Sequence, residues 1–371
     1  MKKFFTIFIV LISLIQSTCN AKIEYSPEID HEISEQLKIN DVKSIENNLP
    51  QYSIDLLKKT NIDSIFAIKN LDIQKLLIII ISSLKDKLSV PIKILIPIIF
   101  ILIFFSVFSS FCESNQEILK FIIVCLVFTS VSYSLIFSIK NLNFSLNLAS
   151  KFILCFIPVF MSFAIASGSP LAAVSFNSTV LYFNQIIIDF VQNLLMPITN
   201  VMISLCLISS LSKKIKFEKL FKAFDSLIKW ILISLAMVVS FVFSIQKIVG
   251  NSVDNILTKK VRFFAGLVPI VGTSLCEATS IVRSSAKIIE SNLGAFGIIS
   301  VLFIFLPPLL ECYAWNLSLQ ICEFLGQMFG FDQIGVLFSS LRKIINISLA
   351  ISIIFIFVFM FATSAIMKIQ I

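Results

Sequence analysis

A stripe of polar residues lies in an otherwise apolar part of the chain, and its residue types could bind water, ions or another protein. Residues 266–294 read GLVPIVGTSLCEATSIVRSSAKIIESNLG. In a helix that begins near Thr273, the polar residues recur at spacings of three and four and therefore share one face. We call this face the polar seam, and its members are Thr273, Glu277, Ser280, Ser284, Lys287 and Ser291.

The charges on the polar seam restrict where it can lie. A charged side chain at the centre of a bilayer costs about 2.5–3.5 kcal/mol, so we do not expect the seam to face lipid tails. Arg283 stands beside the seam, and Glu290 lies one turn beyond Lys287, within reach of it. Two interpretations stay open: an amphipathic helix at the membrane surface, or a seam that lines a water path or contacts another chain.

Enzyme chemistry has little support in the sequence. Ser284 and Lys287 fit the SxxK pattern of serine acylases, but other Ser–Lys pairs with the same spacing occur, among them Ser82–Lys85 and Ser210–Lys213. The chain contains no GxxxxGK phosphate loop and no HExxH or GxSxG motif. Its single histidine, His31, and eight cysteines without a CxxC pair argue against a metal site or a disulfide framework. We therefore expect no catalytic residue, no metal and no cofactor, and a partner would supply any energy.

The composition places the chain in a membrane. Of its 371 residues 57% are apolar and only 14% are charged, whereas soluble proteins carry about 25% charged residues. Several apolar runs exceed the roughly 18 residues that cross a bilayer core. The net charge of +8 does not indicate nucleic-acid binding, because no basic stretch with interleaved aromatic residues occurs away from membrane-flanking positions. We expect an all-α, polytopic integral membrane protein with six to nine hydrophobic spans.

Eight apolar runs are the candidate spans. They cover residues 91–111, 118–139, 152–165, 171–190, 195–211, 230–249, 293–310 and 347–366. The sequence Ser-Gly-Ser-Pro at 167–170 predicts a break between the third and the fourth. The fourth run contains Asn177, Asn184, Gln185 and Asp189, so it should face protein or water and not lipid.

The N-terminal part divides into two segments ahead of a membrane domain at 76–371. Residues 1–21 have a basic start, a short apolar core and small residues at the end, which predicts a cleavable signal peptide. Residues 22–75 are acidic overall, with apolar stripes of short amphipathic helices. This exported segment either lies on the membrane domain or docks a partner, and both readings stay open.

Charge and periodicity give an expected topology. Residues 213–229 contain six lysines and two acids, which predicts a cytoplasmic position. An exported N-terminus then requires an odd number of crossings before this cluster, either five or three. Residues 217–228 and 334–345 have apolar faces opposite basic ones, so we expect two amphipathic helices at the membrane surface.

Four segments between about residue 148 and the C-terminus resemble the stage III sporulation protein AE family of endospore-forming bacteria. They are PVFMSFAIASG from Pro158, the proline at 197, QKIVGNSVDNILTKKVRF from Gln246, and PIVGTSLCEA from Pro269. The family-like positions are Pro158, Gly168, Pro197, Gln246, Asp254, Lys259, Arg262, Pro269, Gly272 and Glu277. The chain departs from the family pattern at Cys276, where Ser is usual, at Glu277, which stands for Asp, at Ser280, where a second acid is usual, and at Glu290, where Lys is common.

The resemblance implies a non-enzymatic membrane component of the channel complex that joins the mother cell to the engulfed forespore. It implies a position in the mother-cell membrane around the forespore. It also implies partners: other membrane proteins of the same operon, an ATPase among them, and through these a forespore-side protein. An alternative function is a membrane scaffold that recruits those partners without forming a conduit. Association of the chain into a homo-oligomer, the transported substrate and the stoichiometry are left open.

Overall fold

The computed structural model describes residues 45, 49–60, 73–109, 111, 116–211, 217–266 and 271–367. The side chains of some helical residues, among them those at 250–279, lie outside this description. The predicted signal peptide and most of the exported segment before residue 49 also lie outside it. The described residues contain helices and turns and no strand, which confirms the all-α class.

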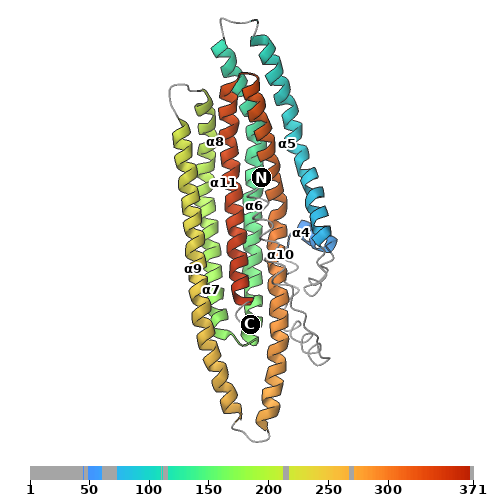
Figure 1. Ribbon diagram of the computed structural model, residues 1–371, viewed down its shortest axis with the longest axis vertical. Coiled ribbons are helices and arrows are strands. Elements are labelled where there is room, and N and C mark those ends of the chain that lie inside the picture. Colours follow the sequence, from blue (N-terminus) through green and yellow to red (C-terminus); the bar gives the residue numbers. More distant parts are fainter. Residues whose placement is uncertain are drawn as a thin grey trace.

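Long antiparallel helices form one elongated bundle (Figure 1). Their bounds are α4 Gln51–Lys59, α5 Ile73–Ser109, α6 Gln116–Ala166, α7 Pro170–Phe190, the π-helical turn η3 Val191–Leu195, α8 Met196–Leu211, α9 Phe217–Gly266, α10 Val271–Met328 and α11 Asp332–Met367. Six segments in the described residues are long and apolar enough to cross a membrane. This number lies within the predicted range.

The eight predicted spans are wrong in two places, because neighbouring runs merge. The runs at 118–139 and 152–165 both belong to α6, a single helix of 51 residues. Residues 140–151 between them are polar but include no Gly or Pro, so nothing ends the helix there. At 1.5 Å per residue α6 is about 75 Å long, more than twice the roughly 30 Å of a bilayer core. The runs at 171–190 and 195–211 likewise join through η3 into one candidate span, Pro170–Leu211.

Helix α10 is the centre of the bundle. In its most apolar window 89% of the residues are buried, against 22% for α5 and for α9, whose outer faces are therefore left for lipid. Helix α10 contacts α4, α5, α6, α9 and α11. At Gly297 the helix lies directly against the ring of Phe156 of α6, which leaves no room for a Cβ. Small residues at such contacts let membrane helices approach each other closely.

Polar side chains connect the helices at several levels. Ser138 of α6 donates to Glu311 of α10, which also pairs with Lys87 of α5 at 3.6 Å. Further connections are Asn184 to Ser150 at 2.8 Å, Gln192 to Asn147 at 2.6 Å, Gln246 to Thr179, Asn316 to Asn346, and Arg342 to Glu323 at 3.2 Å. These bonds satisfy polar groups that lipid tails could not.

The polar residues of the predicted fourth span are partly inside the bundle. Asn184 is buried and donates to Ser150, as the expectation of protein contact requires. Gln185 and Asp189 are exposed and bond to each other, Nε2 to Oδ1 at 3.0 Å. One member of this polar set, Asn184, thus bonds another helix, Asn177 is half-buried, and the two exposed members bond each other.

The two stretches predicted as amphipathic helices at the membrane surface are continuous with longer helices, and their position relative to a membrane stays a prediction. Residues 217–228 open α9, and their apolar face buries Phe221 and Ile228 in the bundle. Residues 334–345 open α11, where Ile334, Phe338 and Leu341 are buried. The stripe at 217–228 is only partly packed, because Leu220 and Leu227 stay exposed. In both stretches no Gly or Pro separates the stripe from the span that follows.

The described part of the exported segment packs on the membrane domain. Ile45, Leu49 and Leu57 are buried, and α4 contacts both α10 and α5. The Tyr52 hydroxyl donates to the Ile304 carbonyl of α10 at 2.9 Å. For this stretch the structure therefore agrees with the first of the two readings.

Candidate functional site at the turn between α6 and α7

The described part of the polar seam faces out of the bundle. Ser280, Ser284 and Lys287 are exposed, and Ser291 is half-buried. Thr273 and Glu277 lie on α10, but their side chains are outside the described ones. This end of α10 extends with α9 past the turn between α6 and α7 (Figure 1). The exposed part of the seam is thus open to water, the membrane surface or another chain.

The buried acid of this region is Glu290. Only 5% of its surface is exposed, and Ser167 Oγ donates to its Oε2 at 2.7 Å. Lys287, one turn earlier, interacts with it electrostatically, as the spacing predicted. The contact with Ser167 was not predicted, because periodicity within one helix says nothing about a partner 123 residues away.

The turn that Glu290 contacts begins with a tight helix end. Gly168 has a φ of 104°, a conformation that side chains rarely adopt. Its N–H donates to the Ile165 carbonyl, and that of Ser169 donates to the Ala164 carbonyl, which is the Schellman arrangement with Gly as the left-handed residue. Pro170 then starts α7 with its fixed φ. The predicted break is confirmed, and these residues explain it.

Arg283 lies directly over this turn. A Cβ added at Gly168 would be 2.6 Å from Arg283 Nε and 2.7 Å from its Cζ. A guanidinium group is favourable there, because the C-terminal end of α6 carries the negative pole of the helix dipole. Arg283 and Glu290 lie two turns apart on α10, so they hold the α6–α7 turn at two points. We call these residues, with Ser167 and Gly168, the turn clamp.

Gly168→Ala should destabilise the protein more than Gly330→Ala. Both glycines have positive φ, 104° and 78°, but nothing lies within 4 Å of a Cβ at Gly330. The Gly330 variant therefore measures backbone strain alone, about 1–2 kcal/mol, whereas the Gly168 variant must also displace Arg283. Thermal unfolding of the purified protein compares the two, and equal losses would contradict contact between Arg283 and the turn.

The other family-like positions are spread over the bundle. Pro158 is exposed on α6, and Pro197 is exposed near the start of α8, just after η3. Gln246 of α9 bonds Thr179 of α7. The side chains of Asp254, Lys259, Arg262 and Glu277 and the surroundings of Gly272 lie outside the description, and Pro269 lies outside the described residues. Gly168 is the family-like position that the structure brings into the turn clamp.

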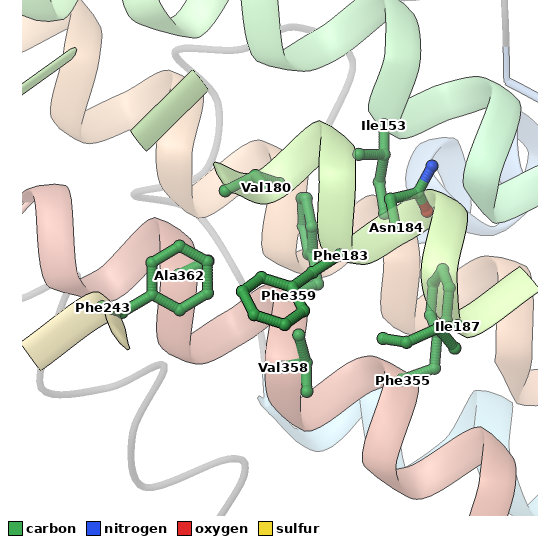
Figure 2. Close-up of a pocket in the computed structure, with 10 residues that line it drawn as sticks. All are labelled: Ile153, Val180, Phe183, Asn184, Ile187, Phe243, Phe355, Val358, Phe359 and Ala362. Carbon is green, nitrogen blue, oxygen red and sulfur yellow. The ribbon is translucent and has the colours of Figure 1, made fainter. Parts of the chain in front are cut away.

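A pocket between α6, α7, α9 and α11 does not include the polar seam. Figure 2 shows its wall, which is apolar except for the amide of Asn184. Its lining residues are Ile153, Val180, Phe183, Asn184, Ile187, Phe243, Phe355, Val358, Phe359 and Ala362. A wall of this kind suits apolar groups and offers nothing to a charged solute.

The clamp holds one hydroxyl, that of Ser167, and one acid, Glu290, in hydrogen-bond contact. Within the described ranges, no group of three or more His, Cys, Asp or Glu residues could hold a metal ion. What the clamp can do is mechanical and electrostatic, because it ties the central helix α10 to the connection between α6 and α7. A movement of α10 would therefore be transmitted to the α6–α7 turn, and a movement of the turn to α10.

Comparison with known proteins gives the chain its family. The family model for stage III sporulation protein AE matches residues 57–370, and so begins within the expected exported segment. Stage III sporulation protein AE of Bacillus subtilis (strain 168) is 21% identical over 216 residues, which are 53% of this chain and 54% of the relative. The match thus spans about half the length of that relative, and no solved structure matches the chain. By the extent of the family match, the chain belongs to the stage III sporulation protein AE family.

Proposed function

We propose that this protein is a non-enzymatic membrane component of the channel or transport complex between mother cell and forespore during endospore formation. The observation that carries the proposal is the family match over residues 57–370, joined to a bundle with six candidate membrane spans. The protein would lie in the mother-cell membrane around the forespore. Its partners would be other membrane proteins of the same operon, including an ATPase, and indirectly a forespore-side protein.

Two structural features support a role in a conduit. The exposed polar residues Ser280, Ser284 and Lys287 lie on the N-terminal part of α10, on a side that faces out of the bundle, where they can meet water or a partner. The turn clamp connects this part to the interior of the bundle. An ATPase in the complex would supply the energy, since the sequence has no nucleotide loop of its own.

The second candidate is a scaffold that holds other members of the complex without a conduit. The dense filling of the bundle around α10 supports it. Large side chains such as Phe305 and Trp315 are fully buried on this helix, and the pocket described above is apolar. Under this proposal the polar seam is a protein contact.

Purification from sporulating cells tests both proposals. A tagged copy of the full chain should bring down the other membrane proteins of the complex, the ATPase among them. Recovery of the tagged protein alone from gently solubilised membranes would contradict membership in such a complex.

Seam variants separate the conduit from the scaffold. Glu277→Gln and Lys287→Ala each remove one charge from the polar seam. If the seam serves a conduit, spore formation should fall while protein level and partner recovery stay normal. If it serves a scaffold, partner recovery should fall together with spore formation. Lys151→Ala is the matched control, because Lys151 is also exposed but lies on α6, away from the seam.

A further inference from the structure

The most enclosed helix of the bundle contains two consecutive prolines. Pro307 and Pro308 lie inside α10, and proline has no backbone N–H to donate. The carbonyls of residues 303 and 304, one turn earlier, therefore lose their usual partners. A freed carbonyl in a low-dielectric interior is costly unless another donor reaches it.

A side chain from the N-terminal segment reaches one of these carbonyls. The Tyr52 hydroxyl donates to the carbonyl of Ile304 at 2.9 Å, across 252 residues of sequence. It thus takes the place of the amide donor that Pro308 lacks. Burial raises the pKa of Tyr52, and nearby hydroxyls of Ser53 and Ser145 oppose the shift, so the phenol keeps the proton that it donates.

The rest of α4 holds Tyr52 in place. Ser53 and Leu57 are buried on the same side of the helix, and Ile45 and Leu49 are buried just before it. Gln51, Asp55, Lys58 and Lys59 are exposed. The helix is thus amphipathic and has only nine residues, too few to be stable without its contacts.

We propose that α4 is a strap that holds α10 at its di-proline step. While the Tyr52 hydroxyl donates to it, the Ile304 carbonyl has a hydrogen-bond partner. Helix α10 then keeps one conformation at Pro307 and Pro308. With Tyr52 withdrawn, α10 becomes free to bend at Pro307 and Pro308, the usual hinge points of long helices. The N-terminal segment is thereby a control element, since whatever pulls it away acts on the central helix.

Hydrogen exchange on the full-length protein tests the strap. Tyr52→Phe removes the hydroxyl and keeps the ring. Loss of one net hydrogen bond should raise exchange of the α4 amides and of the α10 amides flanking the di-proline step by about two- to tenfold. Tyr133→Phe is the matched control, because Tyr133 is 80% exposed, and it should leave both regions unchanged. Unchanged α10 exchange in Tyr52→Phe would overturn the proposal.

A second variant identifies the acceptor. Pro308→Ala restores an N–H that can bond the Ile304 carbonyl, so Tyr52→Phe in this background should no longer raise α10 exchange. The same rise in both backgrounds would show that Tyr52 does not act through this carbonyl, and would overturn the proposal. Elution as a single monodisperse species confirms that each variant is folded.

Discussion

Gly297→Ala should destabilise the bundle by about 1–3 kcal/mol, the usual cost of overpacking a filled core. The added Cβ would lie 2.3 Å from Cζ of Phe156 and within 2.8 Å of its two neighbouring ring carbons. Real Cβ atoms do not approach that closely, so either the ring or helix α10 must move. The expected result is a lower temperature of thermal aggregation for the purified protein and less protein in the membrane.

The ring of Phe156 cannot move freely. Its centroid lies 5.4 Å from that of Phe152 and 5.5 Å from that of Phe160 in a stack along α6, and Phe359 of α11 packs against it at 5.9 Å. Phe156 is fully buried. Because three rings hold it, the strain of the new methyl group passes to the contact between α6 and α10.

Gly326→Ala is the control on the same helix. A Cβ at Gly326 would lie 3.0 Å from Cγ2 of Ile334, so this neighbour needs to shift by only a few tenths of an ångström. The gain in helix propensity, about 1 kcal/mol, should offset that contact. Phe156→Leu should partly rescue Gly297→Ala, since residues in contact have coupled effects of about 0.5–3 kcal/mol. Strictly additive losses in the double variant would contradict direct contact.

The membrane class and the helix positions could be predicted from the sequence, but the length of each helix could not. Apolar runs mark lipid-compatible segments, and each predicted run lies in a helix. Hydropathy also falls at 140–151, where the helix nevertheless continues. The Ser-Gly-Ser-Pro sequence at 167–170 does end a helix, as predicted, whereas the prolines at 158, 307 and 308 lie inside helices. Within the polar stretch, Asn147 accepts a hydrogen bond from Gln192 of η3, and Ser150 accepts one from Asn184 of α7.

The candidate site was predicted in part. The seam face of α10 was assigned from periodicity, and the described members of that face do lie together. Which face is buried was not predictable, because it depends on helices far away in the sequence. Glu290 is buried since the α6–α7 turn packs against its side of α10, and Ser167 provides a donor. In the sequence Ser167 is only a serine beside a helix-ending glycine, and this pattern does not predict a contact with Glu290.

Ser167→Ala should destabilise the protein by about 1–3 kcal/mol, the cost of leaving a buried polar group without its partner. The variant removes the donor to Glu290 Oε2 and creates almost no cavity. Ser162→Ala is the matched control, because the Ser162 hydroxyl bonds the Val159 carbonyl of its own helix. Equal losses in the two variants would show that the bond to Glu290 contributes nothing to stability.

Glu290→Gln distinguishes packing from function at the turn clamp. Glutamine has nearly the same shape and keeps an oxygen that can accept from Ser167, but it is no longer an acid. Glutamine removes the cost of burying a charge and keeps the hydrogen bond, so we expect the free energy of unfolding to stay within about 1 kcal/mol of that of the natural protein. If the acid at 290 serves only packing, spore formation should stay normal in Glu290→Gln and fall in Ser167→Ala along with protein level. If its interaction with Lys287 serves the complex, Glu290→Gln should lose spore formation at a normal protein level.

Because Glu290 and Lys287 interact, Lys287→Ala should then add little to the loss of spore formation in Glu290→Gln. A clearly additive loss would place the two residues in separate roles.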